Sequence, residues 1–379
     1  MKSAIQIYSM SDIHLGHPQL PVTHLIDNLN TSLPDDIKLA HIDLLLLCGD
    51  VFDELLNLPD EIVAEIQIWM VRLLRLCKKW DIVLRVLEGT PKHDRRQSKQ
   101  FSVFNTVLNI EVDFQYVNTL SIEYIDKLDI HMLYVPDEWR ASTEQTKQEV
   151  MQLLQAHNLS QVDFAAMHGY FPHQLPAMLS AAAHDPEFYL GIVRKYIFIG
   201  HVHIPTVWER IIAHGSHGRY NHGEEHPKGF FHVCAYPNDT LLDTITFIAN
   251  KNAARFMSIS VVGLSAEEVE YLLADTVAKG LEGNLNYHIP VHIQVISMKG
   301  DSNEDTIHSY RKSYPLIKWK AKHEVEKSVK GVLNINTYIP LVINNNTIVD
   351  IMRKRLSAFG VNEVMLTDVL ETLNTIKEV

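Results

Sequence analysis

Short apolar runs recur along the first two hundred positions, and polar residues, Gly or His directly follow each one. The clearest runs are residues 5–10, 44–48, 82–87, 164–167 and 196–199. Runs of this length, rich in β-branched or bulky residues, are typical of buried strands. Between them the apolar positions take helical spacing, most clearly over residues 59–79. This alternation predicts an α/β sandwich, whose ligands gather at the carboxyl ends of the strands.

The pattern restarts near residue 250. Residues 256–262 and 289–296 read as strands, and Ser265 followed by Glu268 is typical of a capped helix start. We therefore predict an α/β domain over residues 1–250 and a separate, smaller α+β domain over residues 251–379. The second domain ends in a predicted amphipathic helix over residues 361–379.

Composition narrows the class of protein. The 379 residues are 46% hydrophobic, but the longest apolar run, residues 44–48, is far shorter than the ~20 residues that a membrane helix needs. The first residues lack the pattern of a secretory signal, so we expect a cytoplasmic protein. Cys48, Cys77 and Cys234 are odd in number and widely spaced, which argues against a disulfide framework and against a cysteine zinc site.

Charge and histidine are both concentrated in the first 250 residues. The chain has 34 basic and 46 acidic side chains, a net charge of −12, and 21 histidines, of which 17 precede residue 251. Histidine is the commonest side-chain metal ligand. The acidic excess argues against broad nucleic-acid affinity, so a polyanion would need a local basic patch or a metal.

Five clusters of potential ligands follow predicted strands. They are Asp12 with His14; Gly49, Asp50 and Asp53; His93 with Asp94; His168 with Gly169; and His201 with His203. Alternate residues of an extended segment share a face, so both members of an Asp-x-His or His-x-His pair can reach one site. One such histidine alone is usually structural. All five together predict a divalent-cation centre, and two cations sharing a carboxylate suit phosphate-ester cleavage.

In this order the motifs D-x-H, G-D-x-x-D, H-D, H and G-H-x-H resemble those of the calcineurin-like metallophosphoesterases. The resemblance implies a two-sheet αββα sandwich with a smaller C-terminal α+β capping domain. It also implies that Asp12, His14, Asp50 and His203 bind one metal, and that Asp50 bridges to a second metal held by His168 and His201. His93 would be the catalytic histidine, and Asp53 would orient its ring through a hydrogen bond.

A second stretch of the sequence resembles one group of proteins within this family. Residues 214–230 contain Gly-Ser, then Gly-Glu-Glu, then Lys-Gly-Phe, and are similar to the segment after the last metal motif in SbcD-like double-strand-break repair nuclease subunits. A polar turn is the plainer interpretation of the Gly-Glu-Glu part. The resemblance implies a Mn²⁺-dependent DNA nuclease with 3′-to-5′ exonuclease and endonuclease activity, with Mg²⁺ as a second candidate metal. It also implies a homodimer and an SMC-type ATPase partner similar to SbcC. Residues 361–379 would dock that ATPase or pack on their own domain.

The sequence departs from the family pattern at one motif. Where Gly-Asn-His-Asp is expected, Lys92 stands in place of the asparagine and two extra residues follow Gly89. A protonated ammonium cannot bind a cation, which puts the second metal in doubt. In one interpretation, water or Thr90 completes the ligands of the second metal, and Lys92 turns outward to a DNA phosphate. Arg95, Arg96 and Lys99 follow Lys92 in the sequence and could contact the same DNA. The alternative is an ordinary solvated loop.

Residues 311–330 form the second candidate DNA contact. They contain seven Lys or Arg against two Glu, interleaved with Tyr314 and Trp319. Basic side chains attract phosphates and aromatic rings stack on bases, so Lys318, Lys320 and Lys322 are predicted DNA contacts. A solvated face is the alternative.

Two other functions stay open. One is a phosphoesterase that acts on nucleotides, phosphoproteins or other small phosphate esters with the same metals. The other is a DNA-end-binding scaffold whose hydrolysis is weakened by the change at Lys92.

Overall fold

A computed structural model describes residues 4–36, 41–57, 61–137, 142–174, 183–237, 240–284, 286–298 and 303–324 of the chain. These residues belong to one compact unit that runs through residue 324. Within the described ranges, no helix combines the length and apolar character needed to cross a membrane.

Two six-stranded sheets form the larger part of the fold. The first has the order β12–β11–β1–β2–β3–β4 and the second β5–β6–β7–β8–β10–β9. The strands of the first sheet are β1 (Ile5–Met10), β2 (Leu44–Cys48), β3 (Val83–Leu87), β4 (Phe114–Val117), β11 (Gly229–Ala235) and β12 (Thr244–Ala249). Those of the second are β5 (Ser121–Ile125), β6 (Ile130–Val135), β7 (Val162–His168), β8 (Val193–Gly200), β9 (Thr206–Trp208) and β10 (Ile211–Ala213).

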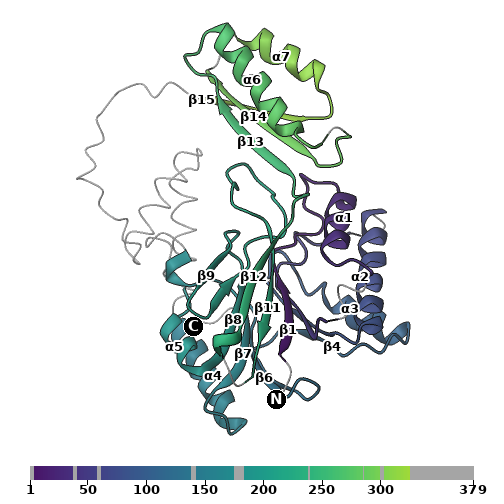
Figure 1. The fold of residues 1–379 in the computed structure, drawn as a ribbon, viewed down its shortest axis with the longest axis vertical. Coiled ribbons are helices and arrows are strands. Elements are labelled where there is room, and N and C mark those ends of the chain that lie inside the picture. Colours follow the sequence, from purple (N-terminus) through teal and green to yellow (C-terminus); the bar gives the residue numbers. More distant parts are fainter. Residues whose placement is uncertain are drawn as a thin grey trace, which may run out of the picture. The chain divides into compact units, whose positions relative to one another are not determined.

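The two sheets stack face to face with helices outside them, as Figure 1 shows. Helices α1 (Val22–Ser32), α2 (Glu61–Lys79) and α3 (Lys99–Val107) cover the first sheet, and α4 (Thr143–Ala156) and α5 (Pro186–Ile192) cover the second. The strands bury both faces: on β2, Leu45 and Leu47 pack under the helices, while Leu44 and Leu46 pack between the sheets. Burial on both faces explains why these strands read as continuous apolar runs. The architecture is the predicted αββα sandwich.

The parallel strands of both sheets end at a common edge. β1 pairs with β2 and β2 with β3 in the first sheet, and β7 pairs with β8 in the second, each time in parallel. At this edge the Nδ1 atom of His168, the last residue of β7, lies 2.8 Å from the carbonyl oxygen of Cys48, the last residue of β2. The two sheets are therefore joined where the predicted ligands follow the strands.

A third, smaller sheet has three parallel strands in the order β13–β14–β15. They are β13 (Arg255–Ser260), β14 (Val291–Met298) and β15 (Lys318–Glu324), and helices α6 (Ala266–Leu281) and α7 (Glu304–Ser313) accompany them. The predicted helix start is confirmed, because Ser265 and Glu268 form a reciprocal capping box at α6. The sheet has an apolar core of its own. The domain boundary at residues 250 and 251 stays a prediction, and the helix predicted over residues 361–379 lies outside the described residues.

Candidate metal centre

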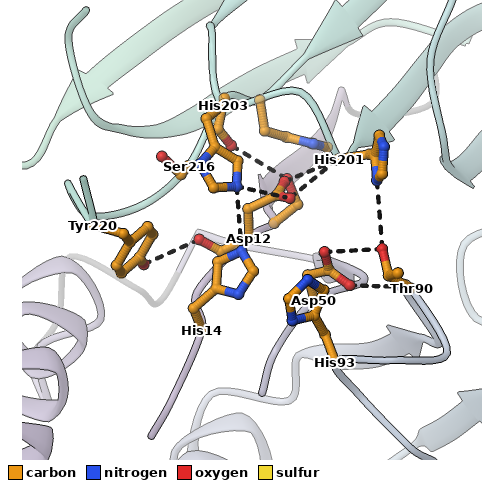
Figure 2. A network of polar contacts seen from close by, with 12 residues as sticks. Asp12, His14, Asp50, Thr90, His93, His201, His203, Ser216 and Tyr220 are labelled. Atoms are coloured by element: carbon orange, nitrogen blue, oxygen red, sulfur yellow. Dashed lines mark hydrogen bonds and ion pairs between the residues drawn. The ribbon is translucent and has the colours of Figure 1, made fainter. Parts of the chain in front are cut away.

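The predicted ligands gather at the shared edge of the sheets in three groups, two of which share His14. They are Asp12, His14 and His203; His14, Asp53 and His93; and Asp50, His168 and His201. Within each group, one nitrogen or carboxylate oxygen per residue lies within 4.8 Å of the others. Figure 2 shows six of these side chains converging on one place: Asp12, His14, Asp50, His93, His201 and His203. The structure thus brings together all six residues predicted to bind metal.

Four of these residues have left-handed backbone. The φ angles of Asp12, His14, Asp50 and His201 are 51°, 51°, 50° and 108°. Few residues other than glycine adopt this region, and such strain persists only where the surroundings enforce it. At the ends of the strands, the backbone is turned so that the ligand side chains point into the centre.

Two glycines let the loops approach each other. A Cβ atom on Gly49 would lie 2.3 Å from Nδ1 of His168, and one on Gly89 would lie 2.1 Å from the backbone nitrogen of Asp50. Neither distance is sterically allowed, so only glycine fits at these positions.

In the first group, two imidazoles face each other. The Nε2 atoms of His14 and His203 lie 3.2 Å apart. Their other ring nitrogens face carboxylates: Nδ1 of His14 lies 3.1 Å from Asp53, and Nδ1 of His203 lies 3.3 Å from Glu224. The Glu224 carboxylate favours hydrogen at Nδ1 of His203, which turns its Nε2 toward the Nε2 of His14. Two imidazole nitrogens at this separation share a hydrogen between them or bind a common cation, so this geometry suits a cation.

The second group is more deeply buried. The Nε2 atom of His168 lies 3.4 Å from the Asp50 carboxylate, and its Nδ1 donates to the Cys48 carbonyl. Burial opposes protonation, but the carboxylates of Asp50 and Asp12 raise the pKa of His168 to about 10. Burial opposes ionisation of Asp50 as well, yet His168 lowers the pKa of its carboxyl. The carboxylates therefore favour positive charge here, which a bound divalent cation supplies while displacing the proton.

Thr90, rather than Lys92, occupies the position expected for the family's asparagine. The Thr90 hydroxyl lies 3.4 Å from Nε2 of His168 and 3.4 Å from Nδ1 of His201, and donates to Asp50 at 3.2 Å. Figure 2 shows Thr90 between Asp50 and His201. Lys92 is exposed. Of the alternatives predicted for this motif, the structure has Thr90 beside the candidate ligands and Lys92 facing outward, because the extra residues form a turn after Thr90. The neutral hydroxyl oxygen of Thr90 therefore lies where the family pattern has an asparagine oxygen.

Asp53 contacts His93 differently from the expectation. Nδ1 of His93 lies 2.5 Å from the backbone carbonyl oxygen of Asp53 and 4.0 Å from its carboxylate. The carboxylate lies closer to Nδ1 of His14. Asp53 therefore orients His93 through its main chain and His14 through its side chain. With the hydrogen of His93 held at Nδ1, Nε2 is its remaining ring nitrogen for chemistry.

The segment similar to the repair nucleases supports the first group. Glu224 faces His203 through one oxygen and Lys228 through the other, the second at 2.8 Å. Lys228 is buried and also donates to Ser216 at 2.8 Å and to the His203 carbonyl at 3.1 Å. Burial opposes ionisation, but His203 and Lys228 lower the pKa of Glu224 to about 2. Sequence reasoning noted the Gly-Glu-Glu and Lys-Gly-Phe residues but gave them no role.

Tyr220 and Asp94 are two further positioning residues; sequence reasoning missed Tyr220 and named Asp94 without giving it a role. The Tyr220 hydroxyl donates to the backbone carbonyls of Asp12, at 3.1 Å, and Ile13, at 2.5 Å. The buried Asp94 carboxylate accepts hydrogen bonds from the backbone nitrogens of Asp50, Phe52 and Gly89, at 2.7–2.9 Å. Its place directly after His93 in the motif was the only sequence signal.

We expect Glu224→Gln to weaken Mn²⁺ binding by about 10- to 100-fold, as loss of a carboxylate that orients a ligand histidine does. The amide removes the charge that holds hydrogen on Nδ1 of His203. Calorimetric titration of the metal-free protein with Mn²⁺ measures the change. Glu225→Gln, at the exposed neighbouring acid, is the matched control. Equal affinity of both variants would remove Glu224 from the centre.

The predicted DNA contacts lie at two places. Lys92, Arg95 and Arg96 are exposed on the turn after Thr90, where Nε of Arg95 donates to the Lys92 carbonyl at 3.0 Å. Lys318, Lys320 and Lys322 are exposed on alternate positions of β15 and so share one face of the small sheet.

Comparison with known proteins leaves the family open. No family model matches the chain, and no curated protein matches its sequence. Among solved structures, GAP50, the anchor in the inner membrane complex of Plasmodium, aligns with a TM-score of 0.38 and 11% identity, covering 66% of this chain and 86% of its own. Another crystal structure aligns with a TM-score of 0.37 and 10% identity, covering 65% of this chain and 100% of its own.

Proposed function

We propose that this protein is a calcineurin-like metallophosphoesterase that cleaves DNA phosphodiesters, as the SbcD-like nuclease subunit of a DNA repair and recombination complex. The observation that carries the proposal is the pair of ligand groups at one sheet edge, one with Asp12, the other with Asp50. Each combines a buried carboxylate with two imidazoles.

The residues present fit divalent cations. Mixed carboxylate and imidazole ligands favour Mn²⁺ over Mg²⁺, which prefers oxygen alone. One ion would be held by Asp12, His14 and His203. The other would be held by Asp50, His168 and His201, with Thr90 beside them. Asp50 is the proposed bridge between the two ions. When bound, two such ions would supply a water nucleophile at neutral pH and neutralise charge on the phosphate.

The protein's own groups supply the remaining steps. Asp94 and Tyr220 fix the loops, so the ligands are arranged before substrate binds. His93 keeps one hydrogen on Nδ1, held by the Asp53 carbonyl; its doubly protonated form would donate the Nε2 proton to the leaving oxygen and return to the neutral imidazole. Glu224 and Lys228 orient His203 and favour the nuclease assignment over a general phosphatase.

The test compares linear duplex DNA with para-nitrophenyl phosphate and bis-para-nitrophenyl phosphate, each with Mn²⁺, Mg²⁺ or EDTA. We expect Mn²⁺-dependent shortening of DNA that EDTA abolishes. Hydrolysis of the small esters with intact DNA would favour the rival phosphoesterase function. Binding of DNA ends with no hydrolysis of any substrate would favour the scaffold.

The partners and the location belong to the same proposal. A homodimer and an SMC-type ATPase follow from the resemblance. The helices α2 and α3 line an apolar groove of ≈ 740 Å³ where Ile68 and Val107 are each 69% exposed, and we propose this groove as the homodimer surface. Light scattering measures whether the mass in solution is that of one chain or two. Free, buried Cys48 and Cys77 suit the proposed cytoplasmic location.

A further inference from the structure

Two loops from neighbouring strands of the first sheet surround His93. The β2 loop, residues 49–57, follows β2, and the β3 loop, residues 88–98, follows β3, which pairs with β2 in parallel. His93 belongs to the β3 loop, and the carbonyl oxygen that accepts its Nδ1 hydrogen belongs to Asp53 of the β2 loop. The direction of the His93 ring therefore depends on how the two loops are held against each other.

Gln97 is a buried amide between the two loops, and the residue is only 7% exposed. Its Nε2 donates to the Glu54 carbonyl at 3.0 Å and to the Asp94 carbonyl at 3.2 Å. Its Oε1 accepts from the backbone nitrogen of Leu56 at 2.9 Å. Glutamate and methionine have a similar size but lack the two amide hydrogens, so neither could form the same bridge.

The bridge lies directly beside the carbonyl that orients His93. The Asp94 carboxylate holds the part of the β2 loop before Asp53, through the backbone nitrogens of residues 50 and 52. Gln97 holds the part after Asp53, at residues 54 and 56. The Asp53 carbonyl lies between these two attachments, so loss of Gln97 would free the segment that follows it.

The backbone directly before Gln97 is strained. Arg95 and Arg96 both have left-handed backbone, with φ angles of 46° and 60°. Few residues other than glycine adopt this region, and such strain persists only where the surroundings enforce it. The buried Glu88 carboxylate accepts a hydrogen bond from the backbone nitrogen of Arg96 at 2.6 Å. Glu88 and Gln97 thus hold the strained turn that follows His93.

We propose that Gln97 is a positioning residue for proton donation by His93. Its amide holds the two loops at the separation at which the Asp53 carbonyl accepts the Nδ1 hydrogen of His93, and this bond directs Nε2 toward the leaving oxygen. The hydrogen bonds of Gln97 go to residues 54, 56 and 94, none of which is a proposed metal ligand. Its effect therefore passes through His93. This inference rests on the proposed function and adds a residue that determines how well a poor leaving group departs.

The test compares DNA with thymidine para-nitrophenyl phosphate, whose para-nitrophenolate leaves without protonation. Gln97→Met keeps the length of the side chain and removes its hydrogen bonds. We expect it to lower kcat for DNA by about 10- to 100-fold, the effect of a small displacement of a catalytic group, with hydrolysis of the nitrophenyl ester and bound Mn²⁺ unchanged. In a chain that carries His93→Gln, the same substitution should have no further effect on either substrate. Gln148→Met, at an exposed position of α4, is the matched control.

The tautomer of His93 gives a second measurement, which does not depend on activity. Long-range proton–nitrogen NMR of the metal-free protein distinguishes a hydrogen on Nδ1 from one on Nε2, and comparison with His93→Gln assigns the signals. The wild type should keep the hydrogen on Nδ1, and Gln97→Met should populate both tautomers. Gln97→Asn retains an amide and leaves room for water, so it provides a variant that folds if Gln97→Met does not. It should show the same changes to a smaller degree.

The outcomes separate the two proposals. Equal losses with DNA and the nitrophenyl ester, or wild-type rates with both, beside a wild-type protein that cleaves DNA, would overturn the role of Gln97 alone. A further loss in the chain with His93→Gln, or an unchanged tautomer, would overturn it as well. If the wild type hydrolyses small esters but not DNA, the proposed function is wrong, and the tautomer measurement still decides the role of Gln97.

Discussion

Asp50→Asn should reduce metal-dependent hydrolysis by at least about 1,000-fold, the largest effect we expect from any single substitution. Asp50 supplies the carboxylate of the second ligand group, and its negative charge favours positive charge at His168. Asparagine retains an oxygen that can accept the Thr90 backbone hydrogen bond, which is 2.6 Å long in the wild type. The variant should therefore fold while losing charge at the position proposed to bridge two cations.

Metal analysis distinguishes the loss of a bound cation from the loss of hydrolysis with both cations still bound. We expect about two Mn²⁺ per wild-type chain and at most one in Asp50→Asn, measured by emission spectroscopy after equilibrium dialysis. Asp126→Asn, at an exposed turn, is the matched control and should bind metal and hydrolyse DNA as the wild type does. A variant that keeps both ions and its activity would show that Asp50 is not a ligand.

The buried strands could be predicted because they bury both faces. Residues 5–10 and 44–48 are strands with the predicted bounds, since an apolar run of this length has few other uses. Several strands were not predicted, among them β9 and β12. β9 has three residues, two of them exposed, and no residue of β12 is buried, so neither has an apolar run. Pairing with neighbouring strands, which a local pattern does not contain, defines them.

The ligand set could be predicted for a related reason. Each candidate ligand lies at the end of a buried strand or within four residues after it, and parallel strands bring their carboxyl ends to one edge. The turn after Gly89 could not be predicted, because alignment to a motif does not show which residue of a longer loop faces inward. Thr90 directly follows Gly89 and stays in the centre, whereas Lys92 lies on the added turn.

The residues that position the candidate ligands were the hardest to predict from the sequence. Glu224 reaches His203 across 21 positions, and Asp94 accepts from a backbone nitrogen 44 positions away. Such contacts depend on how loops from different strands pack. The sequence shows that acidic residues are present, and only the fold shows which histidine or backbone group each one holds.

His93→Gln should lower kcat for DNA by about 100- to 10,000-fold, the range of a lost general acid, and leave KM and bound Mn²⁺ unchanged. Nε2 is the ring nitrogen left for proton transfer once the Asp53 carbonyl holds Nδ1. His226→Gln, an exposed histidine in the loop that carries Glu224, is the matched control. A DNA-binding scaffold would have no metal-dependent activity for this substitution to abolish.

The leaving group separates a proton donor from a metal ligand at this position. His93 also belongs to a group with His14 and Asp53 that could hold a cation. A proton donor matters most for a poor leaving group such as a deoxyribose hydroxyl, and least for para-nitrophenolate, which leaves without protonation. We therefore expect a much smaller loss with thymidine para-nitrophenyl phosphate than with DNA. An equal loss with both substrates, together with less bound Mn²⁺, would instead make His93 a ligand.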